Sequence, residues 1–481
     1  MRIQLPLMFC AIFALQAEVR LPRLVSDHML LQRDVPVRIW GWADPGEQVT
    51  VRFRDQNALA QADTLGRWKV FLQPLTAGGP FTLTIEGSNT ITIQDVLVGE
   101  VWVASGQSNM AFSMRMLEKA EQEIAAANYP QMRLFHVGPA TSAYPLDDVK
   151  GSWSWCTPDS VRRYSAVAYF FARHLREKLG VPVGVILSAW GATPAQAWTS
   201  APAMAADPEL QVYAADWAKF MDLYPEAQMR YEQQLRQPGA KPAQPIGPGS
   251  QRAPSVLFNA MIAPLTPYAI RGAIWYQGES NAGRAYPYRR LFQTLIQDWR
   301  RAWGVGDFPF LFVQLASFKV GPNVEWPELR EAQAMALQLR NTGMAVTVDI
   351  GDPVDVHPKN KQDVGLRLGL EARAIAYGEK LVYSGPVFRQ LTSEGSALRV
   401  WFDHTGGGLR ARGGALRGFT IAGKDGNFVP ADARIENNTV VLSTPEAKEP
   451  AAVRYAWADV PDCNLFNAEG LPAVPFRTVV R

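Results

Sequence analysis

Residues 101–110 of this 481-residue chain read VWVASGQSNM, and this stretch decides the fold that the sequence predicts. Its first four residues are apolar and suit a buried β-strand, and a serine, a glycine and amides follow in a turn. Amphipathic helices are predicted between such strands, for example where apolar residues recur every four positions up to Gly180. The pattern predicts an α/β fold: a parallel sheet with helices on both faces. The other candidate strands are residues 133–137, 183–187, 273–276, 310–315 and 345–349.

Short alternating strands, broken by glycine and proline turns, flank this region on both sides. They predict an N-terminal and a C-terminal β-sandwich-like module. Within the α/β region, a helical piece is followed by a proline- and glycine-rich arm at residues 237–249, and the two together read as a surface insertion. The predicted division is 18–97 for the first β module, 98–380 for the α/β domain with its insertion at about 199–254, and 381–481 for the second β module.

The chain begins with the features of a secretory signal peptide. Arg2 precedes an apolar stretch of about 11 residues, and Ala17 offers a small residue for cleavage. We expect residues 1–17 to be removed and the protein to be exported, to the periplasm or the extracellular space. Cys156 and Cys463 then remain, and export would permit a disulfide, although two free thiols fit equally well.

Composition and motifs exclude several classes of function. The chain has 48 basic and 45 acidic residues without a basic stripe, which argues against a nucleic-acid partner. No internal apolar run reaches the roughly 18 residues of a membrane span. No histidine and cysteine spacing resembles a metal site, and neither a phosphate-binding loop nor a dinucleotide fingerprint occurs. We therefore expect no metal and no cofactor.

Polar residues follow the predicted strands where a parallel sheet binds its ligands. A serine turn follows the first strand, glycine turns and amides follow the third and fourth, and an Asp/His loop at residues 351–358 follows the last. These are the parts of an acyl-transfer site. Of five histidines, His357 lies in this loop, and His136 is its one serious competitor.

Three blocks resemble signatures of a known family: residues 105–110, SGQSNM; residues 275–281, WYQGESN; and residues 356–359, VHPK. They are similar to those of the sialate O-acetylesterase-like family of SGNH/GDSL hydrolases, which are carbohydrate acetylesterases. Further similar stretches extend the resemblance over nearly the whole mature chain. It implies a flavodoxin-like parallel sheet and a serine esterase that removes O-acetyl groups from carbohydrates, most of all from sialic acids.

The resemblance also implies the roles of individual residues. Ser108 would be the nucleophile and His357 the general base. The oxyanion hole would combine the N–H groups of Ser108 and Gly191 with a side-chain amide, from either Gln277 or Asn281.

The identity of the catalytic acid stays open at the level of the sequence. Typical SGNH enzymes have an aspartate three residues before the histidine, but Val354 occupies that position here. We favour Asp355, with Asp352 and Glu279 as alternatives. A Ser–His dyad with a backbone carbonyl in place of the acid is the remaining option.

Two other functions compete with a sialate esterase. One is an acetylesterase of plant polysaccharides such as xylan or xyloglucan, and the other is a non-catalytic carbohydrate-binding protein on the same fold. Arginines near the blocks could bind the sialate carboxylate, but none of them is singled out by the sequence: Arg115, Arg284 and Arg289. Tryptophans near the predicted site could stack on sugars, although the two inside strands suit a core role better: Trp102, Trp190, Trp198 and Trp275, of which the first and last lie in strands.

Overall fold

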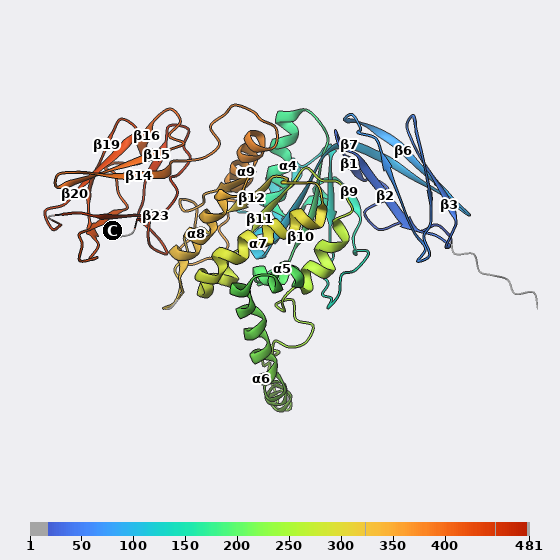
Figure 1. Ribbon diagram of the computed structural model, residues 1–481, viewed down its shortest axis with the longest axis horizontal. Helices are drawn as coiled ribbons and strands as arrows, with labels where there is room; N and C mark the ends of the chain where they lie inside the picture. Colours follow the sequence, from blue (N-terminus) through green and yellow to red (C-terminus); the bar gives the residue numbers. More distant parts are fainter. Residues whose placement is uncertain (1–17, 323, 448, 479–481) are drawn as a thin grey trace, which may run out of the picture.

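The centre of the molecule is a mostly parallel sheet with the strand order β13-β12-β11-β7-β10-β8-β9 (Figure 1). The computed structural model describes residues 18–322, 324–447 and 449–478, so the expected signal peptide at 1–17 lies outside the described residues. The edge strand β9 runs antiparallel to β8. The bounds are β7 (Thr90–Gly106), β8 (Tyr129–His136), β9 (Trp153–Cys156), β10 (Val183–Ala189), β11 (Gly272–Tyr276), β12 (Phe310–Val313) and β13 (Thr342–Ala345).

Helix limits follow the capping residues that the sequence provides. The helix α4 (Ala166–Leu179) begins after Ser165, whose side chain accepts the N–H of Ala168, and ends at Gly180 with φ 65°. Glycine suits this left-handed position because it has no Cβ to clash. Among the described residues, no helix is both long and apolar enough to span a membrane. The other α-helices are α1 (Ser108–Ala111), α2 (Ala120–Ala125), α3 (Pro158–Val161), α5 (Ala201–Ala205), α6 (Gln211–Leu235), α7 (Ala285–Trp303), α8 (Trp326–Ala334) and α9 (Lys361–Ile375).

Alternation along the strands places apolar side chains on both faces of the central sheet. Val101 and Val103 of β7 belong to one core cluster, and Trp102 and Ala104 belong to another. Successive side chains of a strand point to opposite faces, so β7 contributes to both cores. Helices α7 and α8 pack into the first cluster, and α4 and α9 into the second. The expectation of a mixed α/β fold with a parallel sheet between helices is confirmed.

The N-terminal β region is joined to the central sheet through one continuous strand. The first half of β7 pairs with β1 and β6, and its second half pairs with β10 and β11. The predicted limit at 97/98 therefore falls inside a strand of 17 residues. A separate two-stranded sheet, β2 with β5, completes this region. Its strands are β1 (Leu30–Gln32), β2 (Val37–Trp42), β3 (Gln48–Phe53), β4 (Gln56–Gln61), β5 (Arg67–Leu72) and β6 (Gly78–Glu86).

The C-terminal β region contains two four-stranded sheets and a two-stranded one, on the side of the molecule opposite to the N-terminal region (Figure 1). It is fixed to α8 by Arg330, a fully buried side chain whose guanidinium donates to the backbone oxygens of Ala458 at 2.7 Å and Asp459 at 2.9 Å. The strands are β14 (Val387–Glu394), β15 (Ala397–Asp403), β16 (Leu409–Ala411), β17 (Phe419–Ala422), β18 (Val429–Pro430), β19 (Asp432–Glu436), β20 (Thr439–Ser443), β21 (Ala452–Tyr455), β22 (Leu465–Asn467) and β23 (Phe476–Arg477).

The insertion is the part that departs most from the body of the molecule. Helix α6 projects away from the sheet (Figure 1). Among the described residues of this helix, Tyr213 alone is buried. The arm at 237–249 follows this helix, as the sequence predicts.

The predicted strand at 345–349 is wrong. β13 ends at Ala345, and the buried segment that follows it is a loop. Side chains satisfy its backbone oxygens: Arg367 binds that of Val346, and Ser317 binds that of Val348 at 2.7 Å. Burial without strand pairing produces the same apolar pattern as a buried strand, which explains the error.

The central strand order also differs from the flavodoxin order 2-1-3-4-5. Counted along the chain from β7, with the antiparallel edge strand β9 left out, the order is 2-3-1-4-5-6, because β10 lies between β7 and β8. The connections that leave β7 and β11 run in opposite directions along the sheet. The carboxyl ends of these two neighbours therefore form the crevice in which such sheets bind ligands.

Candidate active site

Ser108 stands at the crevice as the first residue of α1, directly after the turn that ends β7. Gly106 in this turn has φ 136°, and a Cβ at this position would lie 2.1 Å from the backbone oxygen of Tyr276. The N–H of Gln107 donates to that oxygen at 3.0 Å. Only glycine fits so close an approach, so the turn holds the serine against the end of β11. As the first residue of a helix, Ser108 has an N–H that no helical carbonyl can bind.

Gly191, the oxyanion residue that the resemblance implies, lies against Ser108. A Cβ added to Gly191 would lie 3.5 Å from the Cβ of Ser108. The preceding residue, Trp190, donates its N–H to the backbone oxygen of Gly106 at 3.1 Å, which ties the turn after β10 to the serine turn. The backbones of the serine turn and of the turn after β10 are therefore side by side.

The two candidate amides, Gln277 and Asn281, are both buried, but they are not equivalent. Gln277 uses its Nε2 group twice, toward the backbone oxygen of Thr193 at 3.3 Å and toward Oδ1 of Asn281 at 2.7 Å. Asn281 donates from Nδ2 to Oε1 of Gln196 at 3.0 Å, which uses one of its two hydrogens. One amide hydrogen of Asn281 therefore remains free to donate, whereas both amide hydrogens of Gln277 are engaged by neighbouring residues.

His357 lies in the loop between β13 and α9, next to Asp355. Oδ1 of Asp355 accepts the backbone N–H of His357 at 2.9 Å and lies 3.5 Å from Nδ1 of the ring. Oδ2 of Asp355 lies 3.2 Å from Nζ of Lys359. Burial lowers the pKa of His357, whereas the negative charge of the Asp355 carboxylate raises it. The hydrogen bond from the His357 N–H lowers the pKa of Asp355, which favours an anion beside the ring.

The two alternative acids have other partners. Oδ1 of Asp352 accepts the N–H groups of Val354 at 2.8 Å and Asp355 at 3.2 Å, which is the hydrogen-bond pattern of a turn residue. Glu279 accepts from Nδ2 of Asn109 at 2.5 Å, and burial raises its pKa. Of the three carboxyl groups, Asp355 is the one with a recorded contact to the His357 ring.

A buried polar network, which the sequence did not reveal, connects the serine turn to the histidine loop. Asn109 donates from Nδ2 to the backbone oxygen of Val356 at 2.9 Å and accepts from Nζ of Lys361 at Oδ1. Lys361 is fully buried, and burial lowers its pKa to about 7. Asn109 thus fixes the residues next to both Ser108 and His357. The signal was present in the signature blocks, where Asn109 stood beside the serine without an assigned role.

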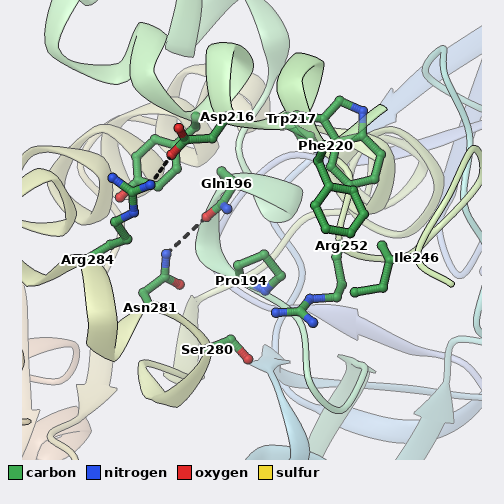
Figure 2. Close-up of a pocket in the computed structure, with 12 residues that line it drawn as sticks. Pro194, Gln196, Asp216, Trp217, Phe220, Ile246, Arg252, Ser280, Asn281 and Arg284 are labelled. Atoms are coloured by element: carbon green, nitrogen blue, oxygen red, sulfur yellow. Dashed lines mark hydrogen bonds and ion pairs between the residues drawn. The ribbon is translucent and has the colours of Figure 1, made fainter. Parts of the chain in front are cut away.

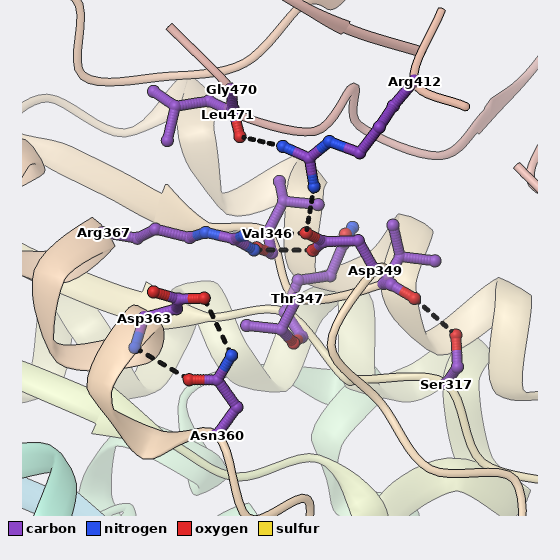
Figure 3. A network of polar contacts seen from close by, with 12 residues as sticks. Ser317, Val346, Thr347, Asp349, Asn360, Asp363, Arg367, Arg412, Gly470 and Leu471 are labelled. Carbon is purple, nitrogen blue, oxygen red and sulfur yellow. Dashed lines mark hydrogen bonds and ion pairs between the residues drawn. The ribbon is translucent and has the colours of Figure 1, made fainter. Parts of the chain in front are cut away.

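The base of the histidine loop is closed by an ion pair between its two ends. Arg367 of α9 binds Asp349 with both terminal nitrogens, at 2.7 and 2.8 Å (Figure 3). Arg412 of the C-terminal region lies 4.0 Å from the same carboxylate and donates to the backbone oxygen of Gly470 at 3.2 Å. The loop that carries His357 therefore starts and ends at fixed points.

The remaining histidines lie away from this crevice. His136 ends β8, which is separated from β7 by β10, and its ring faces Tyr164 at 6.4 Å. His28 binds Asp95, and His404 lies against Tyr383. His174 packs between α4 and α9, and a Cβ added to Gly369 would lie 2.5 Å from its ring.

The tryptophans and cysteines expected near the site are mostly core residues. Trp102, Trp198 and Trp275 are fully buried, so the expectation that Trp198 could stack on a sugar is wrong. Cys156 and Cys463 are both free thiols. In the described part of the chain, no three histidine, cysteine or acidic side chains are grouped closely enough to hold a metal ion.

A cavity borders the site on the side of the insertion (Figure 2). Ser280 and Asn281, from the turn after β11, line it together with Trp217 and Phe220 of α6. These two rings are stacked at 5.9 Å with an angle of 14° between their planes. Neither ring could be selected from the sequence, because only the folded position of α6 brings them to the cavity.

Comparison with known proteins defines the class to which this chain belongs. A family model described as carbohydrate esterase, sialic acid-specific acetylesterase, matches residues 251–372. The chain is similar to the sialate O-acetylesterases of Homo sapiens, with 30% identity over 98% of this chain and 95% of the relative, and of Rattus norvegicus, with 31% identity over 95% and 94%.

A solved structure extends the similarity to three dimensions. The crystal structure of a carbohydrate acetylesterase from Xanthomonas citri has a TM-score of 0.86 and 39% identity, and the match covers 96% of this chain and all of that one. The fold and the relatives define a carboxylic ester hydrolase. The chain belongs to the sialate O-acetylesterase family.

Proposed function

We propose that this protein is a serine esterase that removes O-acetyl groups from acetylated sugars, with Ser108 as the nucleophile and His357 as the base. The observation that carries the proposal is the contact of three loops around Ser108: Gly191 lies against it, and Asn109, its neighbour, binds the residue before His357. The family membership supports the esterase activity.

In the proposed reaction, His357 removes the proton from the Ser108 hydroxyl while the serine oxygen attacks the acetyl carbonyl. The serine–carbonyl bond forms, and the carbonyl oxygen becomes an anion. His357 then protonates the sugar oxygen as the bond to the acetyl carbon breaks. Water, deprotonated by His357, releases acetate from the acyl-enzyme in the second half of the cycle.

The oxyanion is stabilised by the N–H groups of Ser108 and Gly191 and by Nδ2 of Asn281. Removal of one such donor costs about 2.7–4 kcal/mol of transition-state stabilisation in serine proteases. We select Asn281 over Gln277 because both hydrogens of the Gln277 amide are engaged by its neighbours. Gln277 has the role of orienting Asn281 through its hydrogen bond to Oδ1.

Asp355 is the proposed acid of the triad. Its carboxylate lies near Nδ1 of His357, so Nε2 is left to face the serine, and the negative charge stabilises the imidazolium that forms during attack. Asp352 is assigned to the turn, and Glu279 to the buried network with Asn109 and Lys361.

Exchange of the nucleophile tests the proposed function. Ser108→Ala should reduce acetate release from p-nitrophenyl acetate and from an acetylated sugar to the background rate, because no attacking oxygen remains. The circular dichroism spectrum and the melting temperature should stay unchanged, since the side chain is partly exposed and small. A variant that keeps near wild-type turnover would contradict the assignment of Ser108. Sugar binding without turnover in the wild type would instead indicate a carbohydrate-binding protein.

Export is part of the proposal. It rests on the composition of residues 1–17, which is that of a signal peptide. Mass spectrometry of the N-terminus of the mature protein should give Glu18 as the first residue. A mature chain that still begins at Met1 would contradict it.

A further inference from the structure

The cavity beside the site has a floor that belongs to the proposed catalytic loops and a wall that belongs to the insertion. Ser280 and Asn281 form part of the floor, and the N–H of Ser280 donates to Oε1 of Gln107 at 3.2 Å, one residue before Ser108. Trp217, Phe220 and Arg252 come from the insertion. A molecule in this cavity would therefore touch the loops that carry the reaction.

The charges that line the cavity do not balance. Asp216 and Arg284 form an ion pair at 2.5 Å and neutralise each other. Arg252 is exposed, and no acidic side chain among the described residues pairs with its guanidinium. Figure 2 shows this group directed toward Pro194 and Ser280, on the floor of the cavity. The cavity therefore offers one unpaired cation beside a pair of stacked aromatic rings.

The other arginines near the signature blocks are not available for this role. Arg289 binds Glu331 at 2.9 Å, and Arg284 is held by Asp216. Arg115 lies in the segment after α1 and is not among the residues that line the cavity. A guanidinium with free donors is the group that binds a carboxylate through two parallel hydrogen bonds.

We propose that Arg252 binds the carboxylate of an acetylated acidic sugar, whose ring lies against Trp217 and Phe220, so that the enzyme prefers anionic over neutral acetylated sugars. This inference rests on the proposed function, because it assigns the substrate class of the same site. It makes the insertion a specificity element that supplies both the cation and the aromatic surface.

The test compares an O-acetylated sialic acid with its C1 methyl ester, which carries the same acetyl group but no charge. Wild-type kcat/KM for acetate release should be at least about tenfold higher for the acid. Arg252→Gln should lower kcat/KM for the acid by about 10–100-fold, the range of a hydrogen bond to a charged group. Turnover of the methyl ester and of p-nitrophenyl acetate should stay within about twofold.

Two further variants make the result specific. Arg236→Gln, an exposed arginine at the end of α6 outside the cavity, should leave the preference intact. Arg252→Lys should keep part of it, because the charge remains and the bidentate geometry is lost. Equal turnover of acid and methyl ester by the wild type, or an equal loss on both in Arg252→Gln, would overturn the inference. Loss of p-nitrophenyl acetate turnover in Ser108→Ala is independent of this result, so the two proposals fail separately.

Discussion

At the scale of single residues, His357 and Asp355 decide how the activity depends on pH. The ring must be neutral to accept the serine proton, so the acidic limb of kcat/KM follows its pKa in the free enzyme. Burial places this pKa below its ordinary value of 6.5. Asp355 raises the pKa, because an anion near Nδ1 stabilises the imidazolium, while Lys359 and Lys361 lower it.

We predict that Asp355→Asn lowers kcat by up to about 10⁴-fold, as loss of the triad acid does in a serine protease. The acidic limb should also move to lower pH, since the stabilising anion is gone and the ring loses its proton more easily. Profiles of kcat/KM against pH for both proteins, with one acetyl ester, measure the two effects.

Parallel variants identify the acid. Glu279→Gln and Asp352→Asn should leave the position of the acidic limb unchanged, because neither carboxylate has a recorded contact with the His357 ring. A limb that moves only in Glu279→Gln would transfer the role to that residue. A small loss of kcat in all three variants would favour a Ser–His dyad.

At the scale of elements, the segment from the serine turn to α9 is held by the buried contacts of Lys361. Lys361→Met should reduce the free energy of unfolding by about 3 kcal/mol, because Asn109 and Glu279 lose their buried cation. Adding Glu279→Gln to this variant should restore part of the loss, since the unpaired carboxyl group is then removed as well. Urea unfolding at pH 6, below the pKa of about 7, keeps Lys361 protonated in the wild type.

The surface neighbour of this lysine provides the control. Lys359 is 43% exposed in its side chain, so Lys359→Met should change the unfolding free energy by no more than about 0.5 kcal/mol. Strictly additive effects of Lys361→Met and Glu279→Gln would contradict coupling through Asn109.

The sequence predicts those elements whose signals lie within a few neighbouring residues. It does not predict features that depend on contacts between segments far apart in the chain. The apolar run at residues 101–104 of β7 and the glycine cap of α4 are local signals, and both are found as predicted. The strand predicted after Ala345 rests on a run of apolar residues, which is visible in the local sequence. The side chains that bind the backbone oxygens of this segment come from distant parts of the chain, so the sequence does not show that the segment is a loop. Arg252 could not be selected either, since its exposure to the cavity depends on how the insertion folds back.

At the scale of the whole molecule, the C-terminal β region stabilises the α/β domain instead of acting as a separate appendage. Arg330 of α8 donates to two of its backbone oxygens, and Glu331 binds Arg477 at 2.9 Å. Truncation would leave a buried guanidinium without these acceptors, which is a severe loss.

We therefore predict that a chain ending at residue 380 is insoluble or inactive toward p-nitrophenyl acetate. Deletion of residues 238–245 in the exposed arm should leave the melting temperature within about 2 °C and small-ester turnover intact, because this segment contributes little to the core. Soluble expression and thermal unfolding of the two proteins measure the difference. A truncated chain with full activity would contradict this account of the C-terminal region.

The continuous strand β7 has a consequence for synthesis on the ribosome. Its second half emerges long before its partners, because β10 begins at Val183 and β11 at Gly272. Until then, the apolar residues 101–104 have unpaired edges, which are sites for association with other chains. Stalled nascent chains that end before residue 272 should be cleaved readily by a protease at β7, and released chains should resist it. The residues that form the centre of the finished enzyme are thus the ones that a chaperone has to protect first.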